Sequence, residues 1–271
     1  MRAFWMMAFT AAAFAQQPAL FEYDRSVPFQ YQEELLRRDG QIEVAGAGFQ
    51  SPKGGKVNMI VVRPVGKGPF AGIVLQHGGG QSMMTYLAEA EVLARAGAVS
   101  LILDAPGSAP GKWKPEDQMT PAEFRDYYAE IVICYRRAID YLQSLKIIDP
   151  ARIAFVGHSY GGIMGGVLVG LDSRVKTFVL IGAIARYTRH ISETQIDYWI
   201  NWRKRYTPEQ LAEALNVIRP IDPDQYVGAQ AHGPILLQCG NFDFVNVEPC
   251  VDLYAAASAP KGVRTQRSAM V

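Results

Sequence analysis

Apolar residues along this chain alternate between short continuous runs and longer stretches with helical spacing. The continuous runs have the length and composition of fully buried strands. They are Ile73–Gln76, Val99–Asp104, Ile153–Val156, Val175–Ile181 and Ile235–Gln238. Strands that are apolar throughout and separated by helices imply a parallel sheet covered on both faces. The pattern therefore predicts a doubly wound α/β domain.

The clearest helix signal begins at Thr120, where Thr-Pro-Ala-Glu combines an N-cap, a proline at the first helical position and a capping-box glutamate. The apolar residues that follow recur at steps of three and four, which places them on one helix face. They are Phe124, Tyr128, Ile131, Tyr135, Ala138 and Leu142. Helices are also predicted over Tyr86–Ala96, after Ser159 and over Val247–Ala257.

The segment before the first core strand has a different pattern. Two β-like runs, Gln41–Phe49 and Val57–Arg63, flank the turn sequence Pro-Lys-Gly-Gly at 52–55 and predict an antiparallel N-terminal hairpin. Upstream of the hairpin, the pattern favours a helix over Tyr31–Arg38, ended by Asp39 and Gly40.

A long insertion separates two of the predicted core strands. It runs from Ala183 to His232 and carries several aromatic residues among Arg and Lys, namely Tyr187, Tyr198, Trp199, Trp202 and Tyr206. It is either a solvated helical pair with aromatic anchors or a cap over a pocket. We favour the cap, because long insertions in such domains usually lie at the functional site.

Composition and charge fit one globular domain with a small partner. Of the 271 residues, 49% are hydrophobic and 20% charged, which excludes a disordered, collagen-like or coiled-coil chain. The formal net charge of +1 gives no electrostatic footprint for nucleic acid or an anionic membrane. A small molecule or a neutral polymer is therefore the expected partner.

The first fifteen residues predict a secretory signal peptide. Arg2 precedes an apolar run that ends in Ala-Phe-Ala at 13–15, which matches an A-x-A cleavage site. The run is too short to span a bilayer of about 30 Å, and the alternatives are an N-terminal anchor or a buried helix. We expect residues 1–15 to be removed and residues 16–271 to be secreted or periplasmic.

Export permits disulfides, but the three cysteines are too few for a disulfide scaffold. Cys134 lies in a helical pattern and is expected to be a small core residue. Cys239 and Cys250 could pair, although the sequence favours two reduced cysteines.

The most specific motif is Gly-His-Ser-Tyr-Gly-Gly at 157–162, directly after a predicted strand and before a helix-compatible run. In that context G-x-S-x-G is a nucleophile elbow, in which Ser159 sits at a strained strand-to-helix turn. A phosphate-binding glycine loop is the alternative. It is set aside because the segment has neither the Lys-Ser/Thr ending of a P-loop nor the G-x-G-x-x-G spacing.

From about Val57 to Ala257 the chain resembles the α/β-hydrolase superfamily, in particular secreted serine esterases of the dienelactone-hydrolase-like and acetyl-esterase-like kind. His-Gly-Gly-Gly at 77–80 stands where that superfamily has its oxyanion loop. The resemblance implies that the N–H groups of Tyr160 and of Gly79, or a neighbouring glycine, stabilise the oxyanion. It also implies that His77 braces this loop and that His158 shapes the elbow.

The resemblance places the catalytic acid after the strand that ends near Gln238, in a G-x-x-D-x-x-V context. Asp243 matches that position, where it would orient and stabilise an imidazole. The alternative is a loop aspartate that caps the next helix. Asp104 resembles the superfamily's structural aspartate after a core strand and is given no catalytic role.

The histidine that the superfamily places after the acid is missing. The four histidines, His77, His158, His190 and His232, all precede Asp243. Residues 261–265 begin as the final core strand, yet no Gly-His loop or closing helix follows. We expect a chain that is truncated or frameshifted near its end. In a complete and active chain, His190 or His232 would be the candidate base.

The resemblance and the motifs together predict a serine carboxylic-ester hydrolase, acting through an acyl-enzyme on a small or medium ester without metal or organic cofactor. The alternatives are a peptidase or amidase on the same fold, and a catalytically impaired binding protein. Within the insertion we expect Tyr198, Trp199 and Trp202 to cover the acyl pocket.

Overall fold

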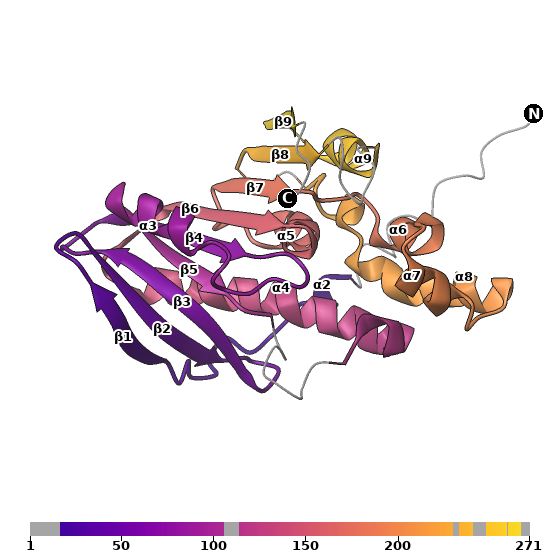
Figure 1. Cartoon of the computed structure of the whole chain (residues 1–271), viewed down its shortest axis with the longest axis horizontal. Coiled ribbons are helices and arrows are strands. Elements are labelled where there is room, and N and C mark those ends of the chain that lie inside the picture. Colours follow the sequence, from indigo (N-terminus) through magenta and orange to yellow (C-terminus); the bar gives the residue numbers. More distant parts are fainter. Residues whose placement is uncertain (1–16, 106–113, 230–232, 241–247, 259, 267–271) are drawn as a thin grey trace, which may run out of the picture.

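The computed structural model describes residues 17–105, 114–229, 233–240, 248–258 and 260–266. Nine strands in this part of the chain form one sheet with the order β1-β2-β3-β5-β4-β6-β7-β8-β9 (Figure 1). The strands are β1 Gln32–Arg38, β2 Ile42–Gln50, β3 Lys56–Pro64, β4 Phe70–Gln76, β5 Ala98–Leu103, β6 Ile148–His158, β7 Thr177–Ile181, β8 Ile235–Gly240 and β9 Lys261–Gln266.

The sheet has an antiparallel and a parallel part. The neighbouring pairs β1–β2, β2–β3 and β3–β5 are antiparallel. The remaining pairs, β5–β4, β4–β6, β6–β7, β7–β8 and β8–β9, are parallel. The predicted mostly parallel sheet and antiparallel N-terminal hairpin are therefore confirmed.

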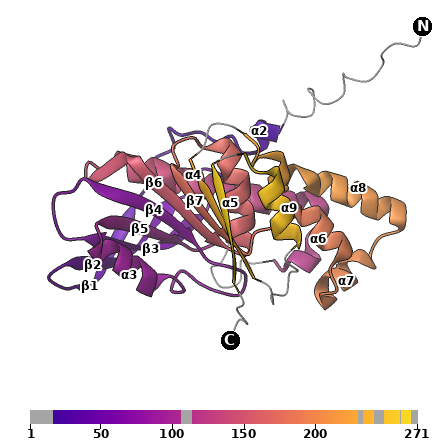
Figure 2. The ribbon, with the colours of Figure 1, turned by 90° about the horizontal axis from the view of Figure 1, so that it is seen from above.

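Helices cover both faces of the sheet, as predicted. On one face α3 (Leu87–Arg95) packs against β2, β3 and β5. On the other face α4 (Pro121–Ser144) and α5 (Tyr160–Leu171) pack on each other and on β6, and α9 (Glu248–Ala256) contacts β8 (Figure 2). This second face holds the larger apolar core.

The longest helix, α4, begins as its sequence predicts. Thr120 Oγ1 accepts a hydrogen bond from Glu123 N at 3.2 Å, and Glu123 Oε2 accepts one from Thr120 N at 2.8 Å. This capping box satisfies two donors that a helix start otherwise leaves unpaired. The expected apolar face of the helix, from Phe124 to Leu142, is buried.

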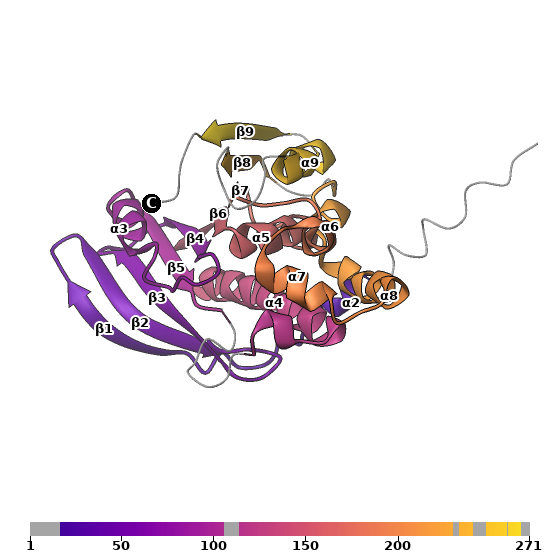
Figure 3. The ribbon, with the colours of Figure 1, turned by 45° about the vertical axis from the view of Figure 1, so that its right-hand side comes forward.

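The insertion between β7 and β8 is helical. It contains α6 (Tyr187–Glu193), α7 (Asp197–Arg203) and α8 (Pro208–Ile218), followed by the short 3-10 turns Arg219–Ile221 and Pro223–Gln225. These three helices lie together at one end of the molecule, where α8 packs against α4 (Figure 3). In the described part of the chain, no helix has both the length and the apolar character needed to cross a bilayer.

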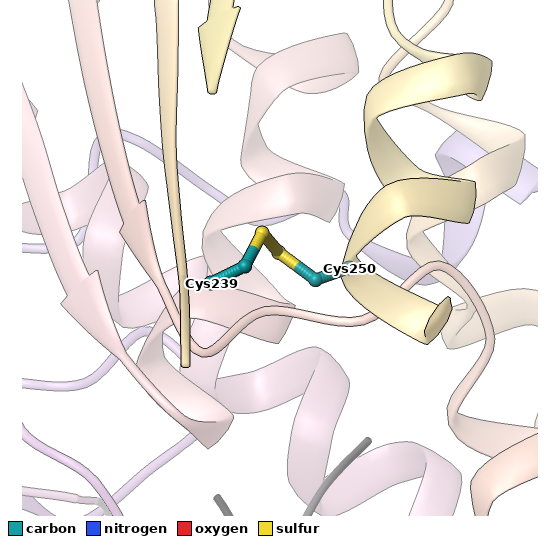
Figure 4. Close-up of a disulfide and its surroundings, with 2 residues drawn as sticks. All are labelled: Cys239 and Cys250. Atoms are coloured by element: carbon teal, nitrogen blue, oxygen red, sulfur yellow. A yellow bond between two sulfur atoms is a disulfide. The ribbon is translucent and has the colours of Figure 1, made fainter. Parts of the chain in front are cut away.

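Two sequence-based expectations are wrong. The segment at 31–38 is the strand β1, because its backbone pairs with β2 from Gln32 to Arg38 and this long-range pairing overrides the weak local preference for a helix. Cys239 and Cys250 form a disulfide, because the end of β8 and the first turn of α9 bring their Cα atoms within 6.0 Å (Figure 4). Cys134 is buried and unpaired, as expected.

Candidate active site

Ser159 occupies the junction between β6 and α5 with φ 51° and ψ −122°, an unfavourable backbone conformation for a residue with a side chain. Ser159 N donates to Ile181 O at 2.8 Å, which holds the strained residue against β7. The turn closes so tightly that a Cβ at Gly157 would lie 2.3 Å from Gly161 O. This is the geometry of a nucleophile elbow.

The glycine loop after β4 lies directly against the elbow. A Cβ at Gly78 would approach His158 Nδ1 to 2.8 Å and Ser159 Cβ to 3.1 Å. Gly78 N donates to Gln81 Oε1 at 2.8 Å, so this N–H group is already engaged. Gly79 has open space around its Cα. Tyr160 is the first residue of α5, and backbone N–H groups in the first turn of a helix lack partners within the helix. These are the two N–H groups that the resemblance implies as oxyanion donors.

His77 braces the glycine loop. Its Nδ1 lies 2.8 Å from Gly78 O and its Nε2 lies 3.1 Å from Asp104 Oδ1. A carbonyl oxygen and a carboxylate oxygen are both acceptors, so a ring nitrogen that carries a proton donates to the oxygen it faces. His77 is therefore held by both nitrogens, in line with the bracing role that the resemblance implies.

A cavity of about 300 Å³ opens beside the glycine loop. Two carboxylic acids and three tyrosines contribute to its wall, but no described lysine or arginine does. The lining residues are His77, Gly78, Gly79, Gly80, Gln81, Asp104, Ala105, Glu116, Tyr127, Tyr128 and Tyr160. The wall thus offers hydrogen-bond acceptors and aromatic faces to a bound molecule.

Glu116 is one of the two acids of this wall. The Tyr128 hydroxyl donates to Glu116 Oε1, and the Tyr198 hydroxyl lies 3.5 Å from Oε2. Burial raises the pKa of the Glu116 carboxyl, because the charged form loses hydration. Tyr128 also shares a hydrogen bond of 2.9 Å with the Tyr187 hydroxyl, which links the cavity wall to α6.

The aromatic residues of the insertion do not cover this cavity as a group. Trp199 and Trp202 are completely buried, and Trp199 packs edge-on against Phe124 of α4 with 5.7 Å between ring centroids. Neither tryptophan is among the residues that line the cavity. Of the three residues expected over the acyl pocket, Tyr198 comes nearest, through its contact with Glu116.

A second cavity, of about 380 Å³, lies between α6 and α9 and contains His190. Arg189 crosses it, with ion pairs to Glu193 at 2.8 Å and to Asp252 at 3.0 Å. Burial, together with the Arg203 charge, lowers the pKa of His190. His190 thus lines a different cavity from the one at the glycine loop. Asp243 and His232, the remaining candidates, lie outside the described residues.

Comparison with known families gives a match over residues 84–266 to Peptidase_S9, the prolyl oligopeptidase family. This chain belongs to the prolyl oligopeptidase family. The matched range includes the elbow, the helical insertion and the segment that contains Asp243. A search of curated proteins gave no significant match.

Solved structures share the fold of this family member. The acetyl xylan esterase from Paenibacillus sp. R4 aligns with 95% of this chain and 87% of its own length, at 22% identity and a TM-score of 0.79. Acetyl xylan esterase 1 from Thermoanaerobacterium sp. JW/SL YS485 aligns with 93% of this chain and 86% of its own length, at 15% identity and a TM-score of 0.78. A prolyl endopeptidase structure aligns with 86% of this chain but 36% of its own, at 18% identity and a TM-score of 0.62. These likenesses establish the α/β-hydrolase fold.

Sequence reasoning missed several residues of the cavity wall. Glu116 belongs to a one-turn 3-10 helix (Glu116–Gln118) between a Pro/Gly-rich loop and α4, and no motif marks it. Tyr128 was expected in the core from its helical spacing, and only the structure shows that its hydroxyl reaches the cavity. For Asp104 a signal exists, because the carboxyl ends of parallel strands meet at the edge where such folds bind ligands.

Proposed function

We propose that this chain is a serine carboxylic-ester hydrolase in which Ser159 is the nucleophile. The observation that carries the proposal is the strained backbone of Ser159 at the β6–α5 junction, in contact with a glycine loop that lines a cavity. Strain of this kind persists only where the surrounding structure enforces it, and it clusters at functional sites.

In the proposed reaction a general base takes the hydroxyl proton of Ser159 as Oγ attacks the ester carbonyl, and the carbonyl oxygen becomes an oxyanion. Tyr160 N–H and Gly79 N–H donate to this oxygen, and each such donor contributes about 3–4 kcal/mol to catalysis. The intermediate collapses with cleavage of the ester C–O bond, and the protonated base gives its proton to the departing alcohol. Water, deprotonated by the same base, then attacks the acyl-enzyme, and the released Ser159 oxygen takes the proton back. Asp243 has the role of the acid that orients the base.

The cavity supports a small neutral ester as substrate. A volume of about 300 Å³ suits a short acyl group, and the acceptors on Asp104, Glu116 and the tyrosines favour an alcohol part that carries hydrogen-bond donors. A substrate carboxylate would face two acids without a described cation beside them. The acetyl xylan esterases among the structural neighbours are consistent with an acetylated polyol.

The proposal is tested with a fluorophosphonate probe, which reacts with an activated serine. Intact-mass analysis of the wild-type chain is expected to show one adduct, located at Ser159 by peptide mapping. The Ser159→Ala variant should stay unlabelled, and Ser173→Ala, at an exposed serine, should label as wild type does. An unlabelled wild type, or equal labelling of wild type and Ser159→Ala, contradicts the proposal.

A peptidase or amidase is the second candidate, and the family match favours it. The two functions are separated by comparing hydrolysis of p-nitrophenyl acetate with that of a prolyl peptide p-nitroanilide. We expect the ester to be hydrolysed faster by orders of magnitude. The alignment supports this expectation, since this chain corresponds to 87% of an acetyl xylan esterase but to 36% of a prolyl endopeptidase.

We also propose that the protein is exported, with cleavage after Ala15. The Cys239–Cys250 disulfide supports this, because disulfides persist mainly in oxidising compartments. N-terminal sequencing of the protein recovered from its native host should begin at Gln16, and recovery of an intact Met1 would contradict export by this route.

A further inference from the structure

Strand β1 forms the antiparallel edge of the sheet, and its outer side has no partner among the described residues (Figure 1). All seven residues from Gln32 to Arg38 are exposed. At the centre of the strand, Leu35 and Leu36 are 52% and 57% exposed. Unpaired edges with apolar residues tend to pair with another strand, so natural proteins normally protect or use them.

The charges of β1 are segregated along the strand. Glu33 and Glu34 precede the two leucines, and Arg37 and Arg38 follow them. A second copy of the same strand, placed antiparallel, would bring its arginines opposite these glutamates. Opposite charges directly across antiparallel strands are stabilising, whereas like charges are destabilising.

A β-bulge brings these charges into register. Against β2, Leu35 is opposite Ala45 and Arg37 is opposite Val44, so Leu36 is the extra residue. Glu34 and Arg37 are therefore each one ladder step from Leu35, and Glu33 and Arg38 are each two steps away. A twofold axis at Leu35 then pairs Glu34 with Arg37 of the second copy and Glu33 with Arg38. Without the bulge, Glu34 would face Leu36.

The two faces of the strand agree with this pairing, because opposed residues on antiparallel strands point to the same face. Arg37 pairs with Glu91 of α3 and so lies on the α3 face. By alternation, Glu34 lies on that face as well, and no ion pair or hydrogen bond of its side chain exists within the described residues.

On the other face, Arg38 and Glu33 belong to one charged network. Arg38 contacts Glu43 at 3.4 Å, and Arg63 pairs with both Glu33 and Glu43. A second copy would extend this network across the axis, again with opposite charges in contact.

We propose that two copies of this chain associate through β1, antiparallel about a twofold axis at Leu35, so that their sheets become continuous. The interface is isologous, since the same strand serves on both sides. This association is independent of the proposed hydrolase activity.

Sedimentation velocity over a concentration series tests the proposal, with the wild-type chain expected to dimerise. Glu34→Arg and Arg37→Glu each place like charges opposite each other at two symmetric positions, and each should weaken the dimer about tenfold or more. The double variant Glu34→Arg/Arg37→Glu exchanges the two charges, so that opposite charges again face each other, and it should restore dimerisation toward wild type. Glu213→Arg, the same charge change at an exposed position of α8, should dimerise as wild type does.

A further variant, Leu35→Pro, places a residue without an N–H group at the centre of β1 and should yield monomer. Circular dichroism spectra and thermal melting identify any variant that has lost its fold. A wild-type chain that stays monomeric at every concentration overturns the proposal. A dimer that persists equally in both single reversals also overturns it, because that dimer uses another surface.

Discussion

Two of the cavities in the described part of the chain differ in what they offer to the reaction proposed above. The cavity beside the glycine loop adjoins the strained Ser159 and is lined by that loop, Asp104 and Glu116. The cavity between α6 and α9 holds His190 among charged side chains that already form ion pairs. Of these two cavities the second has the larger volume, whereas the first is the one that adjoins the strained Ser159.

In the function proposed above, backbone strain beside a glycine loop marks the reaction site, whereas cavity size and the presence of a histidine do not. His77 contributes to the wall of the first cavity, yet both of its nitrogens face acceptors that fix the glycine loop. His190 has a lowered pKa from burial, but its surroundings contain no comparable elbow. Each prediction below changes a residue that lines one of these cavities or that belongs to an element of its wall.

The largest expected effect concerns the wall of the second cavity. Cys250 in α9 is tied to Cys239 in β8 across a separation of 11 residues, and closing such a loop stabilises the fold by about 3 kcal/mol in the chain-entropy model. Cys239→Ser/Cys250→Ser should lose about that much free energy of unfolding, measured by urea denaturation. Reductant should destabilise wild type similarly and leave the variant unchanged. A reductant effect on the variant as large as that on wild type would assign the stabilisation elsewhere.

The next effect concerns the first cavity. A Cβ at Gly78 would lie 2.8 Å from His158 Nδ1 and 3.1 Å from Ser159 Cβ, so Gly78→Ala must displace the His158 ring or move the glycine loop away from the elbow. A displacement near 1 Å at a reacting centre costs about 100-fold in rate, and we expect that loss in the second-order rate of Ser159 phosphonylation. The matched control is Gly40→Ala, because a Cβ at Gly40 has open space around it and Gly40 has no positive φ. Gly97→Ala would not serve, because Gly97 has a φ of 91° that strains any residue with a side chain. Equal loss in both variants would show that loop placement is irrelevant.

Sequence patterns predicted the parts of the molecule that local chemistry determines. The Thr120 capping box, the apolar core strands and the G-x-S-x-G turn all depend on residues close together in the chain. The strand β1 could not be predicted in this way, because Gln-Glu-Glu-Leu-Leu-Arg-Arg has no alternation when both faces are exposed. The Cys239–Cys250 pairing and the approach of Glu116 to Tyr198 depend on how distant elements meet, which spacing does not encode.

The two histidines provide a direct test of the comparison between the cavities. His77→Gln keeps a donor in the loop but loses the simultaneous contacts with Gly78 O and Asp104, so Ser159 labelling should slow by about tenfold. His190→Gln should change labelling by less than about twofold. His77→Gln should also leave the pH midpoint of labelling in place, as expected for a positioning residue. A larger loss in His190→Gln would make His190 the base and bring the second cavity into the mechanism.

The smallest expected effect isolates the buried acid of the first cavity. Burial raises the pKa of Glu116, so the folded state holds this proton more tightly than the unfolded chain does. The stability that this proton provides is fully present below the unfolded pKa and is lost as pH rises through the folded pKa. Glu116→Gln stays neutral at every pH, and its melting temperature relative to wild type should therefore increase from acidic to neutral pH. Glu213→Gln, at an exposed position, serves as the matched variant. A difference between Glu116→Gln and wild type that is constant with pH would mean that solvent in the cavity hydrates the carboxylate fully.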